Sequence, residues 1–338
     1  MGRSDPRPVT PLDLPAVKRA VTHSLPLDLS TALTRGLHGL EDAMLSSVPL
    51  ADLGSPTMLL RNGNGSYVGQ FRHRVGETIA QLTLLAPEPQ EGNAREWSRL
   101  LEAMSVEAGK RGAHLLSAEV AEDHPAFRAF RMAGFAVYSR QVILRRLPGP
   151  VRGGRLGLVR PEMSHDTIAI STLFANTVPR LLQQAEPLPG PDCCGFIYER
   201  DGQIGGYLGV TEGKSGIVIK PYFHPEVYEQ VAEIILSALL YIPRAEDVPV
   251  YLYARAYQDW LRGALEQVEF EPWTHQTLMV KYTVVRVERA ENLALAAPLE
   301  PHRLRPPVAD GPIHWHRISR EGRLSFWRRN GRRASKRS

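Results

Sequence analysis

The stretch that decides the fold spans residues 81–135 and reads QLTLLAPEPQEGNAREWSRLLEAMSVEAGKRGAHLLSAEVAEDHPAFRAFRMAGF. Residues 81–86 form an apolar run of strand length, which predicts a β-strand. The run stops at Pro87 and Pro89, because proline fixes φ and has no backbone donor. A loop and then a helix over residues 93–110 follow. This order is typical of a fold in which a buried strand leads directly into a long amphipathic helix.

The predicted helix over residues 93–110 has charged residues between apolar positions that recur at helical spacing, namely Ala94, Trp97, Leu100, Leu101, Met104 and Ala108. Glycines at its end act as stop signals. Residues 114–120 predict a second strand. Asp123-His124-Pro125 then predicts the start of a short helix, which ends at Gly134.

This order resembles the GNAT superfamily of acyl-CoA-dependent N-acyltransferases. In that family a glycine-containing loop leads into a helix whose N-terminal N–H groups and positive dipole end hold the pyrophosphate of coenzyme A. Gly92-Asn93-Ala94 matches the Gly-x-Ala half of the loop motif, although Pro89 stands where the family has Arg or Gln. The resemblance implies that an acyl-CoA, most simply acetyl-CoA, is the co-substrate. The binding residues it implies are Leu84, Leu85 and Ala86 for the pantetheine amides, with Gln90, Glu91, Gly92, Asn93, Ala94, Arg95, Asp123 and Phe130.

A second family signature, Asn-x-x-Ala-x-x-x-Tyr-x-x-x-Gly-Phe, is matched by Asp123, Ala126, Phe130, Gly134 and Phe135. The family often uses the tyrosine to reprotonate the leaving thiolate, and Phe130 has no proton to give. The resemblance therefore implies that water or substrate takes over this step.

No catalytic residue is fixed by the pattern. Glu119, at the end of a predicted strand, is a candidate general base, but a solvated carboxylate at a strand end is the plainer interpretation. His73 and Glu77 are alternatives of the same standing. His314 and His316 in the tail have no partners at metal-ligand spacing, and no metal site is expected.

The chain has 338 residues, of which 43% are hydrophobic, so it is long enough for two domains. No run is long and apolar enough for a membrane span, and the first residues lack the apolar core of a signal peptide, so a cytoplasmic protein is expected. Cys193 and Cys194 are adjacent, which suits neither a disulfide framework nor a metal site, and predicts buried reduced thiols.

The plan of the first half repeats after a Pro- and Gly-rich stretch, and Phe270 follows Phe135 by 135 residues. We predict an α+β protein with two tandem GNAT-like domains, each a mixed, mostly antiparallel sheet flanked by helices. The predicted boundaries are residues 7–147 for the first domain, 148–155 for a linker, 156–288 for a degenerate second domain and 289–338 for a basic, flexible tail. The second copy is predicted to be degenerate because its loop over residues 219–228 contains no glycine.

Basic residues gather at the C-terminus, where residues 301–338 hold 11 Lys and Arg against 2 Asp and Glu. The rest of the chain has 30 basic and 34 acidic residues, so only the tail is basic. This tail is a candidate for weak binding of nucleic acid or other polyanions, beside the simpler interpretation of a solubilising segment. Two functions stay open. One is acyl transfer to a small-molecule or peptide amine, and the other is a non-catalytic protein that senses acyl-CoA or binds nucleic acid or protein.

Overall fold

The structure is a computed structural model that describes residues 5–36, 55–63, 65–186 and 194–283. The chain divides into two units, residues 1–287 and 288–338, and every described residue belongs to the first unit. The predictions for the basic tail and for Cys193 lie outside the described residues.

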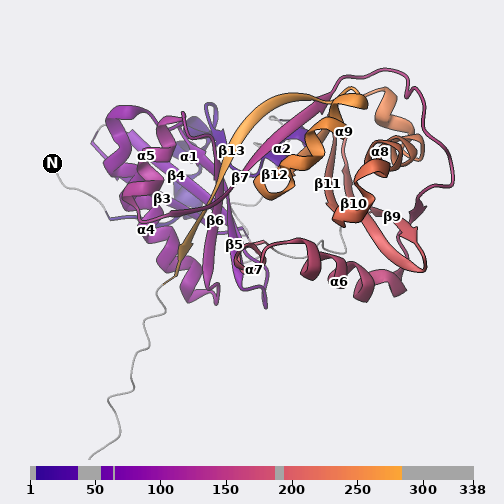
Figure 1. Cartoon of the computed structure of the whole chain (residues 1–338). Coiled ribbons are helices and arrows are strands. Elements are labelled where there is room, and N and C mark those ends of the chain that lie inside the picture. Colours follow the sequence, from indigo (N-terminus) through magenta and orange to yellow (C-terminus); the bar gives the residue numbers. More distant parts are fainter. Residues whose placement is uncertain (1–4, 37–54, 64, 187–193, 284–338) are drawn as a thin grey trace, which may run out of the picture. The chain divides into compact units, whose positions relative to one another are not determined.

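The first half contains α-helices that cover a sheet (Figure 1). Its strands are β1 (Arg7–Pro8), β2 (Leu25–Pro26), β3 (Thr57–Asn62), β4 (Gly65–Arg72), β5 (Ile79–Ala86), β6 (Leu115–Val120) and β7 (Ala136–Arg146). Its helices are α1 (Leu14–Val21), α2 (Leu29–Arg35), α4 (Ala94–Lys110) and α5 (Pro125–Met132).

The second half repeats this order. Its strands are β8 (Arg160–Pro161), β9 (Cys194–Arg200), β10 (Gln203–Glu212), β11 (Ile217–Phe223), β12 (Val250–Arg255) and β13 (Glu271–Tyr282). Its helices are α6 (Thr167–Thr177), α7 (Arg180–Gln183), α8 (Val231–Leu240) and α9 (Arg262–Gln267). The predicted α+β class is confirmed, since most neighbouring strands of the sheet are antiparallel.

Two hairpins form at short sequences that favour tight turns. The pairing of β3 with β4 extends as far as Asn62 and Gly65, and the Asn62-Gly63 sequence stands at this end of the hairpin. In the second half, Asp201 and Gly202 join β9 to β10 with φ values of 52° and 75°. Two successive positive φ values match the right-handed twist of the strands, which explains why an Asp-Gly pair stands at this turn.

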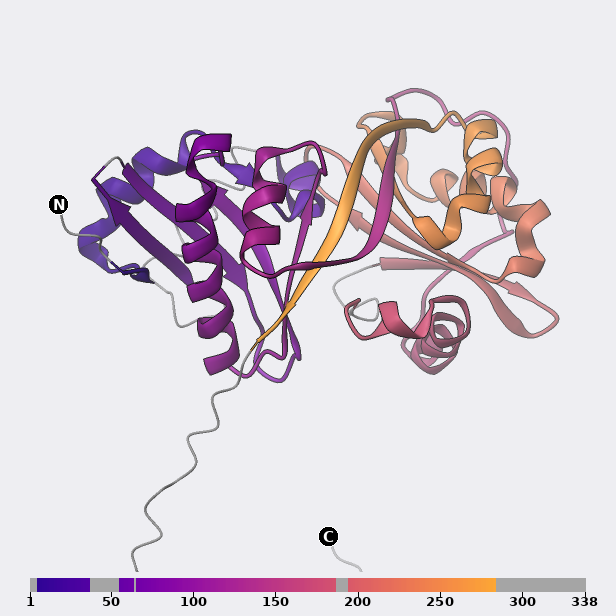
Figure 2. The ribbon, with the colours of Figure 1, turned by 60° about the vertical axis from the view of Figure 1, so that its left-hand side comes forward.

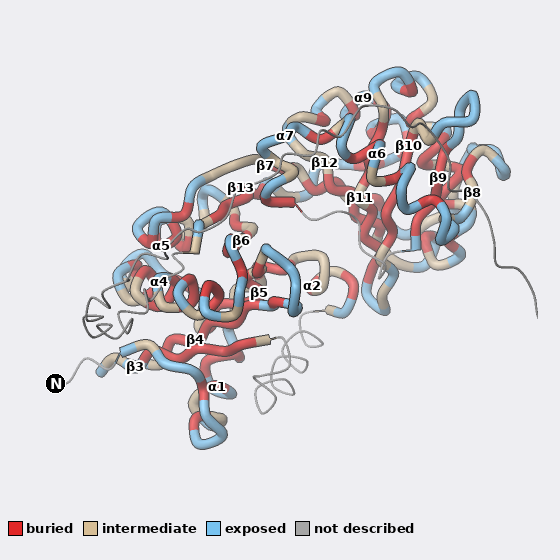
Figure 3. Tube along the Cα trace, turned by 90° about the horizontal axis from the view of Figure 1, so that it is seen from below, coloured by how far each residue is buried: buried red, intermediate tan, exposed pale blue. Residues whose placement is uncertain are grey.

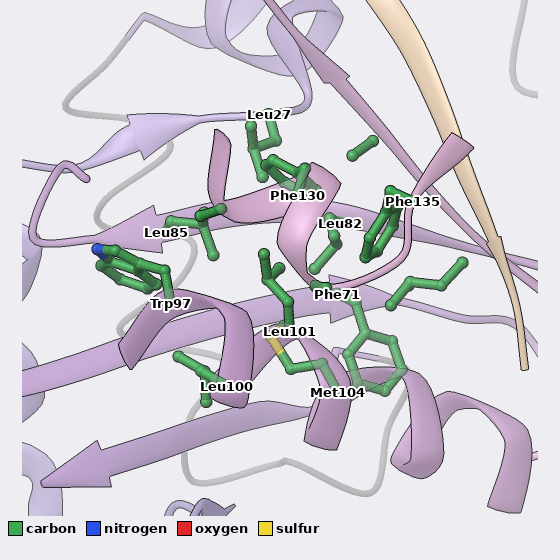
Figure 4. Packing of buried hydrophobic residues seen from close by; sticks show 14 of the residues in the cluster. Leu27, Phe71, Leu82, Leu85, Trp97, Leu100, Leu101, Met104, Phe130 and Phe135 are labelled. Atoms are coloured by element: carbon green, nitrogen blue, oxygen red, sulfur yellow. The ribbon is translucent and has the colours of Figure 1, made fainter. Parts of the chain in front are cut away.

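The core of the first half lies between its sheet and the helices α4 and α5 (Figure 4). Trp97, Leu100, Leu101 and Met104 of α4 are fully buried, as the helical spacing predicts. Most of β4 and β5 is buried as well (Figure 3). The 17-residue helix α4 is therefore held by its apolar face, since packing contributes more to helix stability than propensity does.

Among the strands that the structure describes, the last strand of each half pairs only with strands of the other half. The sheet order is β1-β3-β4-β5-β6-β13-β7-β12-β11-β10-β9-β8. Thus β13 lies between β6 and β7, and β7 lies between β13 and β12 (Figure 2). Each half completes its sheet with a strand that the other half supplies.

The pairing of β7 with β13 places equivalent residues of the two halves opposite each other. Gln141 pairs with Gln276, and their side chains form a 2.7 Å hydrogen bond. These residues are 135 apart in sequence, the same separation as Phe135 and Phe270. A local pseudo-twofold axis therefore passes between Gln141 and Gln276.

A buried aspartate near the start of each half accepts two hydrogen bonds from one arginine. Arg7 donates to Asp13 at 2.7 and 2.8 Å, and Arg160 donates to Asp166 at 2.7 and 2.9 Å. The aspartates also accept from backbone N–H groups of Thr10 and Met163. The hydrogen bond from Arg160 lowers the pKa of Asp166 to about 2, and that from Arg7 lowers the pKa of Asp13 well below its usual value.

We expect Asp166→Asn to lower the free energy of unfolding at neutral pH by about 2 kcal/mol. The folded pKa of Asp166 is depressed to about 2, so its stabilising effect is present above the unfolded pKa near 4 and is lost as pH falls from about 4 to about 2. Denaturant unfolding at pH 7 and at pH 3 measures this. The matched control is Asp201→Asn, a highly exposed turn aspartate. A deficit of equal size at both pH values would contradict an ionic role for Asp166.

One local expectation needs correction, and one helix start gains detail. Cys194 is exposed at the start of β9, so the prediction of a buried thiol is wrong for this residue. The N-cap of α5 is His124, whose Nδ1 accepts from the Ala126 N–H at 3.1 Å, while Asp123 precedes the cap and is exposed. The unprotonated Nδ1 of His124 accepts a backbone hydrogen bond, which is the capping role that an aspartate or asparagine oxygen has at many helix starts.

Candidate functional site

In both halves a parallel pair of strands separates after three residues. β5 pairs with β6 over Ile79–Gln81, and β11 pairs with β12 over Ile217–Ile219. The sequence-predicted co-substrate site of the first half lies beyond this separation, where β5 leads into α4, and the equivalent position of the second half precedes α8. The two positions are equivalent in the repeat.

The loop before α4 has room for an anion. Glu91–Asn93 form one turn of 3-10 helix, and the side chain of Asn93 accepts from the Gln90 N–H at 3.0 Å. A Cβ built at Gly92 would meet nothing within 4 Å, and Gly92 has no positive φ. Neither packing nor backbone conformation requires glycine here, and an absent side chain lets a ligand approach the backbone closely. This part of the site fits a pyrophosphate.

The residues around this loop carry mixed charge. Arg95 is exposed and its position in the first turn suits a phosphate. Glu91 and Glu96 stand in the same region, and Glu88 pairs with His124 at 3.0 Å. Carboxylates near a helix N-terminus already interact with its dipole, so they reduce the attraction for a second anion.

The edge of β5 that was predicted to bind pantetheine is already paired. Leu25 and Pro26 of β2 pair with Leu85 and Leu84. The Leu27 N–H donates to the Thr83 carbonyl at 2.9 Å, and the Glu88 N–H donates to the His23 carbonyl at 2.7 Å. A backbone group that is bonded within the chain is not available to a ligand. In this conformation the predicted contacts of Leu84, Leu85 and Ala86 with pantetheine do not fit.

Phe130 does not face a site. It is fully buried and packs edge to face against Phe135 at 5.0 Å between ring centroids (Figure 4). Its side chain has no exposed surface in this structure, and its contact with the co-substrate stays a prediction. Replacing the family's tyrosine by phenylalanine removes a hydroxyl that this core would otherwise have to satisfy.

Glu119 lies in a polar cluster between the two halves. Its carboxylate accepts from Gln141 Nε2 at 3.1 Å, and Gln141 also donates to Gln276. Burial raises the pKa of Glu119 above its usual value, and the positive charges of Arg255 and Lys220 oppose that rise. A carboxylate with a raised pKa is a better base once ionised. The candidate is therefore chemically reasonable, although sequence reasoning missed Gln141, Gln276 and Arg255, which come from other strands.

His73 and Glu77 lie away from this region. They stand in the connection from β4 to β5, at the opposite end of β5 from α4. His73 is buried, and its Nε2 contacts the Glu77 carbonyl at 2.9 Å. The structure does not bring either residue to the loop before α4.

The second half departs further from a co-substrate site. Pro221 of β11 has no N–H, and its carbonyl accepts from the buried Gln258 Nε2 at 2.7 Å. The turn that leads to α8 is a 3-10 helix, Pro225–Gln230, without glycine. The turn before α8 thus lacks the glycine that the first half retains, and its strand edge is bonded within the chain as it is in the first half. The missing glycine supports the prediction that this copy is degenerate.

Comparison with solved structures identifies the architecture. A tandem GNAT protein from the clavulanic acid biosynthesis pathway aligns with 14% identity and a TM-score of 0.51, covering 83% of this chain and 98% of that chain. The chain has the tandem GNAT fold. A GCN5-related N-acetyltransferase from Sphaerobacter thermophilus aligns with 13% identity and a TM-score of 0.51, covering 82% and 95% of the two chains. No family model and no curated protein matches the sequence.

The tandem GNAT fold thus confirms the resemblance on which the sequence interpretation depends. No helix in the described part of the chain is long and apolar enough to cross a membrane. Across residues 5–36, 55–63, 65–186 and 194–283, no group of three or more His, Cys, Asp or Glu side chains is placed to hold a metal ion.

Proposed function

We propose that the chain is an acyl-CoA-dependent N-acyltransferase, with an acyl-CoA bound to the first half and an unidentified primary amine as acceptor. The observation that carries this proposal is Gly92, which neither packing nor φ requires and which stands at the start of α4 within a tandem GNAT fold. The residues that would hold the pyrophosphate are Gly92, Asn93, Ala94 and Arg95. An acyl-CoA would supply the activated thioester.

The paired edge of β5 sets a condition on this proposal. Pantetheine amides gain partners on Thr83 and Leu85 only if residues 23–28 release them. β2 has only two residues, so few backbone hydrogen bonds must be exchanged. We therefore expect the nucleotide end of coenzyme A to bind while β2 stays paired, and the pantetheine arm to bind only when β2 leaves the edge of β5.

Calorimetry with two ligands tests this proposal. We expect acetyl-CoA to bind the full chain and Gly92→Val to weaken that binding at least tenfold, because a branched side chain occupies the space over the loop. The matched control is Gly263→Val in the first turn of α9, where a Cβ meets only Tyr228 Oη at 3.7 Å. The second ligand is 3′-phospho-ADP, which is the nucleotide part of coenzyme A without the pantetheine arm. Equal affinity for acetyl-CoA and 3′-phospho-ADP would mean that β2 stays paired and that pantetheine adds nothing to binding. Acetyl-CoA binding that is undiminished in Gly92→Val would contradict the proposed site at the loop before α4.

A non-catalytic GNAT-fold binding protein is the second candidate. The observation that favours it is that both strand edges, at Thr83–Leu85 and at Pro221, are bonded within the chain. Absence of acetyl-CoA binding in the calorimetry above would support this candidate. Whether residues 301–338 bind polyanions stays a prediction, because they lie outside the described residues.

A further inference from the structure

A small cavity lies in the second half at the point where β11 and β12 separate. We name it the tyrosine cavity, and its volume of about 10 Å³ is room for one water-sized occupant. Lys220 and Pro221 of β11 line it, together with Tyr253 and Arg255 of β12, directly after the paired part of the two strands. The other lining residues are Glu186, Tyr222, Tyr257 and Gln258. A cavity of this size has no room for a pantetheine arm, so its occupant is not the acyl-CoA of the proposed function.

Three buried polar atoms of the lining have no hydrogen-bond partner among the described residues. They are Tyr253 Oη, Arg255 Nη1 and Tyr257 Oη. Tyr253 is only 2% exposed, and Lys220 Nζ lies 5.6 Å from the centroid of its ring. Buried polar atoms are nearly always satisfied in folded proteins. The three atoms therefore indicate that an occupant completes the tyrosine cavity.

All of these groups can donate a hydrogen bond. Burial raises the pKa of Tyr253 and of Tyr257, so both hydroxyls keep their protons at neutral pH. Arg255 Nη1 is a donor only, and Lys220 forms no ion pair within the part of the chain that the structure describes. An occupant that accepts hydrogen bonds and carries negative charge meets every one of these donors favourably.

The carboxylates within electrostatic reach of the tyrosine cavity already have donors of their own. These pairs are Glu186 with Arg255 Nε at 3.0 Å, Glu119 with Gln141 Nε2 at 3.1 Å, and Asp28 with Arg72 at 3.6 Å. In the lining itself, Lys220 and Arg255 stand against the one carboxylate of Glu186. The ammonium of Lys220 is thus left without a countercharge, which favours an anion over water as the occupant.

We propose that the tyrosine cavity binds a single halide ion, namely chloride. The ion accepts hydrogen bonds from the hydroxyls of Tyr253 and Tyr257 and from Arg255 Nη1, and Lys220 balances its charge. Chloride is only slightly larger than water, so it suits the volume. The bound ion joins β11 to β12 just beyond the point where the two strands stop pairing. This inference does not depend on the proposed acyl transfer.

Thermal unfolding of the full chain in mixtures of sodium chloride and sodium gluconate tests the binding. Ionic strength stays constant, and gluconate is too large for the cavity, so the mixtures vary the supply of the small anion. We expect Tm to rise and then to saturate as chloride replaces gluconate, because a ligand that binds only the folded state stabilises it. Bromide should act as chloride does. A Tm without a saturable response to either halide would overturn the proposal and leave water as the occupant.

Tyr257→Phe locates the ion, since it deletes one hydroxyl and keeps the ring. We expect the chloride concentration at half-saturation to rise about tenfold, the ratio for one lost hydrogen bond to a charged group. In gluconate the same variant should be at least as stable as the unsubstituted chain, because it removes a buried hydroxyl that has no partner among the described residues. Tyr282→Phe, at a position that is 68% exposed, is the control and should respond to chloride as the unsubstituted chain does.

Lys220→Met tests the charge, and it should abolish the saturable rise in Tm. The linewidth of the chloride NMR signal gives a second measurement that does not depend on stability. It should broaden in the presence of the unsubstituted chain and of Tyr282→Phe, and much less with Tyr257→Phe or Lys220→Met. If Tyr257→Phe and Lys220→Met both keep the response of the unsubstituted chain, the ion binds elsewhere and the site is refuted.

Discussion

Separate fragments 1–150 and 151–338 are each expected to lose cooperative unfolding. In the first fragment β7 has no partner strand, because it pairs only with β12 and β13. In the second fragment β13 has none, because it pairs only with β6 and β7. Circular dichroism during thermal and denaturant unfolding measures the transitions. Strands without partners leave rows of unpaired N–H and C=O groups, so both fragments should also aggregate.

A mixture of the two fragments provides the informative comparison. If the exchanged strands are the cause, mixing fragments 1–150 and 151–338 should restore a single transition. A chain that ends at Glu300 is the control, because it retains every described strand and should unfold with the midpoint of the full chain. Fragments that each unfold cooperatively at that midpoint would show that the halves are independent domains.

Arg255→Met is expected to lower the free energy of unfolding by about 3–5 kcal/mol. Arg255 Nε donates to Glu186 at 3.0 Å, and the two side chains are only 11% and 4% exposed. Burial disfavours the charge on Arg255, but Glu186 and Glu119 outweigh this effect and raise its pKa. Removing the guanidinium leaves the Glu186 carboxylate buried without a countercharge, which is the main source of the loss. Denaturant unfolding at pH 7 measures the change.

The double variant Arg255→Met, Glu186→Met separates the charge from the packing. It should recover most of the stability, because replacing both partners by apolar side chains removes the stranded charge. Arg262→Gln breaks an exposed ion pair and should change the free energy of unfolding by less than about 0.5 kcal/mol. A double variant as unstable as Arg255→Met would mean that the shape of Arg255, rather than its charge, holds the region together.

The sequence predicts well what depends on neighbouring residues. The apolar spacing in residues 93–110 predicts α4, and the Asn-Gly and Asp-Gly turns predict two hairpins, because turn conformation follows from a few adjacent residues. Gly92 lies in the turn directly before α4, as the loop motif predicts. The family resemblance supplies the rest of the first half.

Long-range pairing explains what the sequence does not predict. Residues 136–146 have the pattern of a strand, yet nothing in that pattern specifies β12 and β13 as neighbours. Likewise, Leu25 and Pro26 carry no sign that they will bond the edge of β5. The polar cluster at Glu119 joins Gln141 to Gln276, which is 135 positions later, so its members could not be recognised together.

The exchange of β7 and β13 also constrains biosynthesis. A ribosome makes the strands of the first half long before residues 271–282 leave its exit tunnel, so the space between β6 and β7 stays unfilled through most of translation. During that interval the edge of β6 is open to any other nascent chain, including a neighbouring copy on the same messenger RNA. We therefore expect that the first half does not fold as a separate domain on the ribosome and becomes native only after β13 has been made.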